Sequence, residues 1–548
     1  MALAHHGRGL NGISAKLMRL GLAAAALFAM TGARAEDLPR LETRDGKHAL
    51  IVDGAPFLVL GAQVNNSSAW PAMLPKIWPM VNRLHANTVQ VPIAWEQIEP
   101  KEGKFDFSFL DQLLREARAN DKRLMLLWFA TWKNTAPAYA PAWVKLDNKR
   151  FPRMLNAKGE VHYALSPFAK STLEADRRAF VRLMAHLKAA DPQNTVITVQ
   201  VQNEPGTYSS ARDHSPEANR LFAGPVPDAV RKRFGKGAGN WTALFGRDAE
   251  LYFHSWAVAS YIDSVAAAGK KVKALPMYAN AALPGNPFDW QDPNTFASGG
   301  PSPAVIDIYE AAAPSLDWVS PDIYNPDHKA YLGFLDRYAR KDNPLFVAET
   351  GNARHYARYF FATIGRGAIG FSPFGMDETG YSNYPLGAPK LDEDAVAAFA
   401  RNYELFAPMQ RVWARAAAAG KVWGAAEPTD PAAKFTQELN LGGYTATVTF
   451  GRPQFGFDPP KGNAWPSGGL AVAELGPDEY LVAGFNARIE FARPATDKRP
   501  LLFDRVEEGY YDKDKWVFVR RWNGDQTDYG LNFTGAKQVL RVKLATYR

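Results

Sequence analysis

The chain has no cysteine among its 548 residues. It therefore forms no disulfide, offers no thiolate nucleophile and cannot build a cysteine-ligated zinc site. Its 10 histidines are scattered along the chain, and no H-E-x-x-H pair occurs. Because a zinc site needs several ligands at close spacing, no catalytic metal is predicted.

Long hydrophobic runs are also missing. The apolar stretch at residues 20–30 is too short to span a bilayer as a helix. Lys16 and Arg19 precede this stretch, and an A-R-A sequence follows it and ends at Ala35. The pattern is typical of a secretory signal, with a frayed apolar N-terminus as the alternative. We predict a signal over residues 1–35, export to the periplasm or the extracellular space, and no membrane span in the mature chain.

The chain carries little excess of charge of either sign. The formal net charge is +8, and four of the positive charges lie in residues 1–35, which leaves about +4 on the remainder. This bias is weak for so long a chain, so no nucleic-acid partner is predicted. The hydrophobic content of 47% and charged content of 22% are ordinary for a globular protein. Aromatic residues reach 12% and can fill a core or cover the faces of sugars.

One glycine-rich sequence resembles a cofactor motif. Residues 365–370 match G-x-G-x-x-G. A dinucleotide site needs this motif after a strand and at the start of a helix. Here the motif ends a predicted helix and enters a predicted strand, so we reject it and predict no cofactor.

Short apolar runs alternate with helical patterns over most of the chain. The strands are predicted at residues 57–63, 87–95, 123–132, 196–203, 273–279, 317–324, 345–349 and 368–374. The helices are predicted at residues 74–85, 109–120, 171–190, 251–268, 303–313, 331–340, 356–364 and 394–405. Nearly continuous apolar strands are buried on both faces, as in a parallel sheet. Eight such units predict a (β/α)8 TIM barrel over residues 36–415, with an open doubly wound sheet as the alternative.

The character of the chain changes near residue 416. Short strand-like runs at residues 444–450, 469–474, 479–485 and 517–522 are separated by Gly, Pro and Asp. This spacing predicts a smaller β-rich accessory domain over residues 416–548. The domain either buttresses the barrel or binds carbohydrate.

Two glutamates end two of the predicted barrel strands. Glu204 follows the fourth strand and Glu349 ends the seventh. Active sites of parallel barrels lie at the C-terminal ends of the strands, so these two carboxylates are expected to face each other across the mouth. A pair of carboxylates is what a glycosidase needs, about 5–5.5 Å apart for retention and about 6.5–9.5 Å for inversion. The alternative is that each glutamate is an ordinary loop residue.

The chain resembles the clan of retaining glycosidases that carry catalytic glutamates on strands four and seven. The resemblance rests on Asn203–Glu204, on Glu349, and on the run from Trp95 through Glu99–Pro100 to Phe107. It covers residues 50–410 and is strongest for the β-galactosidases of glycoside hydrolase families 35 and 42, with family 35 preferred. The resemblance implies Glu204 as acid/base and Glu349 as nucleophile. The chain departs from family 42 in lacking a zinc-binding cysteine cluster.

Further residues at strand ends are candidates for binding the sugar. The substrate-binding candidates are Asn203, Trp95, Glu96, Trp132, Tyr324 and Gln63, and Tyr278 and Asn280 are further possible wall residues. Aromatic rings can cover the apolar face of a pyranose, and the clan resemblance implies that Tyr324 holds an oxygen of the nucleophile. The alternatives are barrel packing for the aromatic residues and a salt bridge at the rim for Glu96.

These observations predict a secreted retaining exo-glycosidase that releases terminal β-D-galactosyl residues from oligo- or polysaccharide side chains. Its expected partner is a galactose-containing saccharide, and the pattern makes no prediction of oligomeric state. One alternative is a clan relative with a longer cleft, of β-mannanase or β-glucanase type. The other alternative is a glycan-binding protein without catalysis, in which either glutamate is dispensable.

Overall fold

The computed structural model describes residues 38–430, 432–451 and 459–547. The predicted signal at residues 1–35 lies outside the described residues. Within the part of the chain that is described, no helix combines the length and the apolar character needed to cross a membrane.

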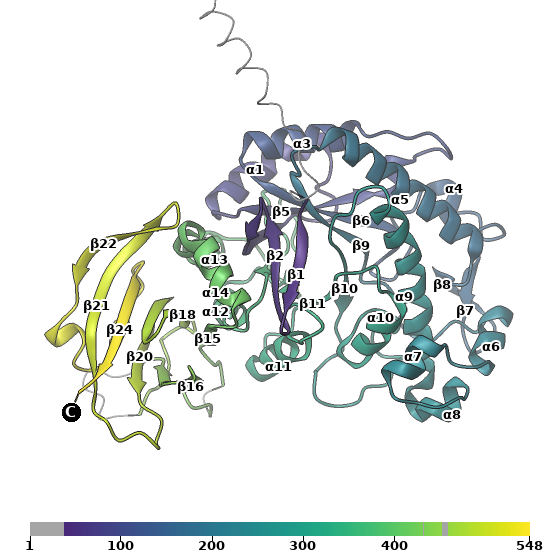
Figure 1. The fold of residues 1–548 in the computed structure, drawn as a ribbon. Coiled ribbons are helices and arrows are strands. Elements are labelled where there is room, and N and C mark those ends of the chain that lie inside the picture. Colours follow the sequence, from purple (N-terminus) through teal and green to yellow (C-terminus); the bar gives the residue numbers. More distant parts are fainter. Residues whose placement is uncertain (1–37, 431, 452–458, 548) are drawn as a thin grey trace, which may run out of the picture.

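A closed parallel barrel forms the larger part of the molecule (Figure 1). Its strands are β4 (Val59–Gln63), β5 (Thr88–Ala94), β6 (Arg123–Lys133), β9 (Val196–Asn203), β10 (Met277–Ala282), β11 (Trp318–Ile323), β12 (Phe346–Val347) with β13 (Glu349–Thr350), and β14 (Gly370–Phe371). The seventh strand is interrupted at Ala348. Its first half pairs with β14 and its second half with β11, and β14 pairs with β4, so the sheet closes on itself. The TIM-barrel prediction is confirmed, and the open sheet is wrong.

Helices cover the outside of the barrel. They are α1 (Leu74–Arg83), α3 (Ser108–Ala119), α5 (Lys170–Ala190), α9 (Ala249–Lys270), α10 (Ile306–Ala312), α11 (His328–Tyr338), α12 (Tyr359–Ile364), α13 (Glu393–Phe406) and α14 (Gln410–Ala418). Helix α3 shows why they pack: Leu110, Leu113, Leu114 and Ala117 follow helical spacing and are buried against the sheet. Further helices lie in the loops, namely α2 (Trp95–Ile98), α4 (Ala142–Lys145), α6 (Pro216–Ala223), α7 (Asp228–Arg233) and α8 (Trp241–Phe245).

The structure shifts or adds several elements. The fifth strand begins at Met277 rather than at residue 273, directly after Pro276, which has no backbone N–H to donate to a ladder. An N-terminal hairpin, unpredicted, consists of β1 (Arg40–Arg44), β2 (Lys47–Val52) and β3 (Ala55–Pro56). Leu50 and Val52 of this hairpin join a buried cluster with barrel residues such as Met125 and Ile197. A second unpredicted hairpin, β7 (Arg153–Leu155) with β8 (Val161–Leu165), lies in the loop after β6.

The C-terminal part is a β-sandwich. One sheet has the order β15-β18-β19-β24-β21-β22 and the other the order β16-β17-β20-β23. The bounds are β15 (Val422–Ala426), β16 (Thr436–Asn440), β17 (Thr445–Thr449), β18 (Gly469–Gly476), β19 (Glu479–Phe485), β20 (Ala487–Ala492), β21 (Leu501–Asp512), β22 (Lys515–Arg521), β23 (Leu531–Phe533) and β24 (Val539–Thr546). Residues from both sheets, including Val448, Val482 and Leu531, share one apolar core. The predicted β-rich domain is therefore present.

Candidate active site

Three carboxyl groups meet at the C-terminal end of the barrel. Glu204 follows β9, Glu349 begins β13, and Asp322 lies in β11. One oxygen from each of the three lies within 4.8 Å of the others. The structure thus brings together the two glutamates that the sequence singled out and adds an aspartate that it did not.

The backbone at the end of β9 is bent so that Glu204 enters the mouth. Gln202 and Glu204 have φ angles of 67° and 44°, values that non-glycine residues rarely adopt. The ladder between β6 and β9 jumps here from Trp128–Val201 to Lys133–Asn203. Strain of this kind persists only where surrounding contacts hold it.

Those contacts come from buried side chains on either side of the bend. The Gln202 amide donates to Asp176 Oδ2 at 2.7 Å and accepts from the backbone N–H of Trp132 at 3.0 Å. The backbone N–H of Glu204 donates to Asn280 Oδ1 at 2.9 Å. The position of Glu204 is therefore fixed by hydrogen bonds to both of its neighbouring strands.

Glu349 receives one donor on each carboxylate oxygen. Gln63 Nε2 donates to Oε1 at 2.7 Å, and the Tyr324 hydroxyl donates to Oε2 at 2.7 Å. Gln63 is itself held by Gln90, whose Nε2 donates to Gln63 Oε1. Charge-assisted hydrogen bonds of this kind stabilise a negative charge. The surroundings of Glu349 suit an ionised nucleophile.

The surroundings of Glu204 favour its protonated form. Burial, followed by the nearby charge of Glu349, raises the pKa of Glu204 to about 7. The charge of Lys133 and a hydrogen bond with Asp322 act in the other direction. Glu204 is therefore protonated below neutral pH, as a general acid must be.

Asp322 is a site residue that the sequence analysis missed. It is 2% exposed, and its Oδ2 accepts from Asn280 Nδ2 at 2.7 Å. Burial and the charges of Glu349 and Glu204 raise the pKa of Asp322 well above its ordinary value. The sequence signal is an acid inside an apolar strand, two residues before Tyr324.

Asn203 lies beside the two glutamates. Its Oδ1 accepts from Gln200 Nε2 at 2.9 Å and from Asn280 Nδ2 at 3.2 Å. Its own Nδ2 makes a long contact of 3.4 Å with Asn134. The amide donor of Asn203 is thus oriented by its acceptor side and has capacity left for a sugar hydroxyl.

The structure does not bring the two predicted tryptophans to the site. Trp95 is fully buried, and its indole N–H donates to Glu99 at 2.9 Å. Trp132 is 1% exposed and packs edge-on against Tyr261 of α9. Both rings are buried by contacts inside the protein, as the packing alternative expects, and their assignment as sugar platforms stays a prediction.

Two further wall candidates also have structural roles. Glu96 forms a salt bridge at the rim with Lys145, at 2.8 Å. Tyr278 is fully buried and stacks on Trp318, with ring centroids 5.1 Å apart. The rim salt bridge and barrel packing, respectively, account for these residues, whereas Asn280 does lie in the site.

The three carboxyl groups are close enough to share a cation. However, both oxygens of Glu349 already accept hydrogen bonds. Burial and the charges of Glu349 and Glu204 raise the pKa of Asp322, which disfavours the charged form that a cation needs. The donor set therefore suits proton transfer better than metal binding.

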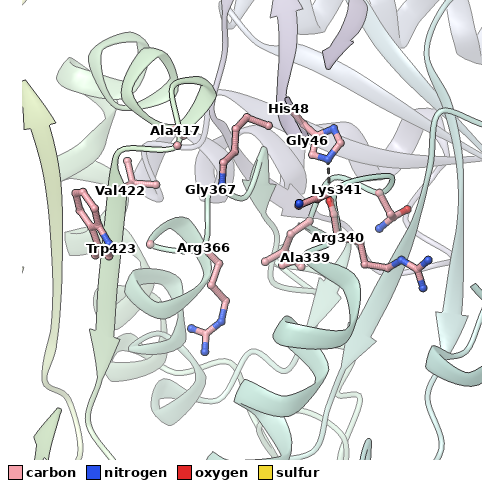
Figure 2. Close-up of a pocket in the computed structure, with 15 residues that line it drawn as sticks. Gly46, His48, Ala339, Arg340, Lys341, Arg366, Gly367, Ala417, Val422 and Trp423 are labelled. Carbon is pink, nitrogen blue, oxygen red and sulfur yellow. Dashed lines mark hydrogen bonds between the residues drawn. The ribbon is translucent and has the colours of Figure 1, made fainter. Parts of the chain in front are cut away.

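A hollow of about 310 Å³ lies at the opposite end of the barrel (Figure 2). The β1–β2 turn, the ends of α11, α12 and α14, and β15 meet there. His48, Lys341 and Arg366 are among its lining residues, and none of the lining residues is acidic. The hollow has no carboxylate for acid–base work, so we do not assign it to catalysis.

Two family models match the chain. A model described as beta-galactosidase, of glycoside hydrolase family 42, matches residues 66–267, and a domain of unknown function matches residues 399–534. No curated protein matches the chain. The first match supports a glycoside hydrolase of the (β/α)8 clan. It fits family 42 and gives no support to the preference for family 35.

Solved β-galactosidase structures are similar to about two thirds of the chain. The enzyme from Bacillus circulans sp. alkalophilus is 14% identical with a TM-score of 0.48, and the alignment covers 65% of this chain and 57% of that one. The enzyme from Rahnella sp. R3 is 17% identical with a TM-score of 0.47, covering 66% and 58%. The enzyme from Marinomonas ef1 is 13% identical with a TM-score of 0.49, covering 68% and 62%. The aligned part spans about three fifths of each of these enzymes.

Proposed function

We propose that this protein is a retaining β-galactosidase in which Glu204 is the acid/base and Glu349 the nucleophile. The observation that carries the proposal is the approach of the two carboxyl groups, with oxygens within 4.8 Å of each other. Carboxyl oxygens that approach this closely favour the shorter carboxyl separation of a retaining enzyme, about 5–5.5 Å, over the about 6.5–9.5 Å of an inverting one. The close approach is consistent with direct attack by Glu349 on the sugar.

In the first step the protonated Glu204 gives its proton to the glycosidic oxygen. The Glu349 carboxylate attacks the anomeric carbon as the bond to the leaving group breaks, and a glycosyl-enzyme forms. The pKa of about 7 keeps Glu204 protonated until that moment. Tyr324 and Gln63 hold the attacking carboxylate in place.

In the second step Glu204 acts as a base. Its carboxylate takes a proton from water, the water oxygen attacks the anomeric carbon, and the bond to Glu349 breaks. The charge on Glu349 is neutralised in the intermediate, which removes one of the influences that raise the pKa of Glu204. The same residue can therefore serve as acid and then as base.

The choice of a galactosyl residue is supported by the matched family model, which is described as beta-galactosidase. The preference for a terminal residue is part of the proposal. Glu349 is 4% exposed, so a sugar must enter the end of the barrel to reach it.

The test is hydrolysis of aryl β-galactoside, glucoside, mannoside and fucoside by the wild type, Glu204→Gln, Glu349→Gln and the control Glu217→Gln. Glu217 is exposed on α6 and pairs with Arg220. We expect hydrolysis of the galactoside in preference to the others. We also expect kcat to fall at least about a hundredfold in both site variants, with no change in the control. A glutamine variant of either site residue that keeps full activity would contradict the proposal.

We propose in addition that the protein is exported and that cleavage follows Ala35. The support is the pattern of basic, apolar and small residues in 1–35. N-terminal sequencing of the periplasmic and secreted fractions is expected to begin at Glu36. An intact N-terminus found only in the cytoplasm would contradict it.

A further inference from the structure

The loop after β10, residues 283–302, builds a hollow of about 210 Å³ that the proposed mechanism does not use. We call it the outer hollow. The lining residues that matter here are Asp248, Phe288, Trp290, Gln291, Ser302 and Arg337. They come from this loop, from the region just before α9, and from α11.

The loop that forms the outer hollow is joined to the catalytic mouth on two sides. Thr207, three residues after Glu204, pairs with Ser298 through backbone hydrogen bonds of 2.7 and 2.9 Å. Asn325, next to Tyr324, donates to the carbonyl of Gly285 at 2.9 Å. The outer hollow is therefore held in a fixed relation to the segments that carry the acid and the tyrosine donor.

Two large aromatic side chains are exposed at the outer hollow. Phe288 is 47% exposed and Trp290 48% exposed. The Trp290 indole N–H donates to Asp248 at 2.8 Å, and Arg247 lies 5.0 Å from the ring centroid. These contacts fix the ring, while about half of its surface faces solvent. Clustered apolar surface of this kind on a soluble protein marks a binding site more often than chance.

A polar group of the same hollow lacks a partner. Ser302 is one of the lining residues and is 1% exposed, and its buried hydroxyl has no hydrogen-bond partner among the described residues. Buried polar groups are nearly always satisfied in native proteins. By contrast, Gln291 is fixed by bonds of 2.8 Å to Gly285 and Asn286.

We propose that the outer hollow binds a sugar residue of a β-galactan chain, away from the residue that is cleaved. The outer hollow offers a fixed indole that is about half exposed, a hydroxyl without a partner and the guanidinium of Arg337. These groups suit a pyranose, which has an apolar face and a rim of hydroxyls. This inference rests on the proposed function for the identity of the sugar. The inference implies a polymeric substrate that binds both at the catalytic site and at the outer hollow.

The test compares Trp290→Ala and Ser302→Ala with the wild type and with Tyr529→Ala. Tyr529 is 56% exposed in the C-terminal domain and serves as a matched aromatic control. Kinetics are measured on an aryl β-galactoside and on β-1,4-galactan. For Trp290→Ala we expect kcat/KM on galactan to fall at least about fivefold, through KM. Hydrolysis of the aryl galactoside should stay within about twofold of the wild type. Equal effects on both substrates, or none on galactan, would overturn the inference.

Binding without turnover separates this inference from the proposed function. Glu349→Gln, with and without Trp290→Ala, is run in native gels that contain β-1,4-galactan. We expect galactan to retard Glu349→Gln and the added Trp290→Ala to abolish most of the retardation. If the wild type lacks galactosidase activity but galactan still retards Glu349→Gln more than the double variant, the proposed function is wrong. The proposal that the outer hollow binds galactan is then supported. If galactan retards neither protein, or retards both equally, the proposal that the outer hollow binds galactan is wrong.

Discussion

At the residue scale, two glutamates of the same chemical type differ because their neighbours differ. Glu349 has a donor on each oxygen, from Gln63 and Tyr324. Glu204 faces another carboxylate and is desolvated, which raises its pKa to about 7. Two acids whose surroundings differ in this way can divide the roles of nucleophile and acid.

The pH profile depends on Lys133. Its charge lowers the pKa of Glu204, so the uncharged substitution Lys133→Met is expected to raise that pKa above about 7. Glu204 then keeps its proton to higher pH, and the alkaline limb of kcat/KM on an aryl galactoside moves upward. Lys145→Met is the control: Lys145 bonds to Glu96 at the rim and to the carbonyl of Ala138, so its loss should leave the alkaline limb in place. A shift of the alkaline limb to lower pH in Lys133→Met would contradict the role of Glu204 as the acid.

The buried carboxylate of Asp176 holds the bend at the end of β9. It accepts from Trp128, Thr131 and Gln202 at 2.7–2.8 Å and from Tyr261 at 3.2 Å. An amide cannot accept all four, so Asp176→Asn is expected to lower the free energy of unfolding by about 2–4 kcal/mol.

The same substitution should also lower kcat on the aryl galactoside, because Gln202 is released next to Glu204. Urea unfolding and kinetics check the two effects. The exposed Asp228→Asn is the control. If Asp176→Asn keeps the kcat of the wild type, the bend at the end of β9 does not depend on the hydrogen bond from Gln202 to Asp176.

The sequence does not show which side chains of a buried strand point toward the mouth of the barrel. Both faces of a barrel strand are apolar, one toward the barrel interior and the other toward the helices. Trp132 therefore looked like a pocket wall but packs on α9. Asp322 was missed for a related reason, because only the closed barrel places it against both glutamates.

At the element scale, long apolar runs were predictable and interrupted ones were not. Strand β9 occupies residues 196–203 as predicted, because its burial is continuous. The seventh strand divides at Ala348, and no periodicity in the sequence signals that break. The N-terminal hairpin was missed because its charged outer strand lacks the alternation of a core strand.

The break in the seventh strand is tied to β5 by Gln90. Its Nε2 donates to the carbonyl of Ala348 at 2.9 Å and also to Gln63. Gln90→Leu removes both bonds and leaves Gln63 free to turn away from Glu349. We expect kcat to fall about tenfold, which corresponds to the loss of one hydrogen bond.

Kinetics on the aryl galactoside test the effect of Gln90→Leu. Gln112→Leu is the control, since Gln112 bonds only to Glu116 on α3. Unchanged kcat in Gln90→Leu would mean that Gln63 is positioned without help from β5.

At the scale of the whole molecule, one sheet of the sandwich joins the apolar core of the barrel, while the two sheets of the sandwich enclose a core of their own. Helix α12 packs on β15 and β18, and Phe361 contacts Phe485 with ring centroids 6.2 Å apart. The backbones of α12 and β15 approach so closely at Gly365 that an added Cβ would lie 2.1 Å from Gly424 N. The sandwich therefore acts as a buttress for the wall of the barrel that carries the seventh and eighth strands.

Gly365→Ala tests this close contact. The clash is expected to reduce the free energy of unfolding by about 1–3 kcal/mol and to lower Tm, with both domains unfolding in one transition. Gly237→Ala is the control, because its Cβ would meet no atom within 4 Å. Calorimetry showing a separate, unshifted barrel transition would contradict the shared core.

The most direct test of the account is rescue of the two glutamate variants by azide. Glu349→Ala removes the nucleophile, so azide attacks the activated galactoside directly and is expected to give the α-galactosyl azide. Glu204→Ala still forms the glycosyl-enzyme, so azide is expected to give the β-galactosyl azide. The anomeric configuration of each product is read by NMR. The reverse assignment of the two products, or the same anomer from both variants, would contradict the roles of Glu204 and Glu349.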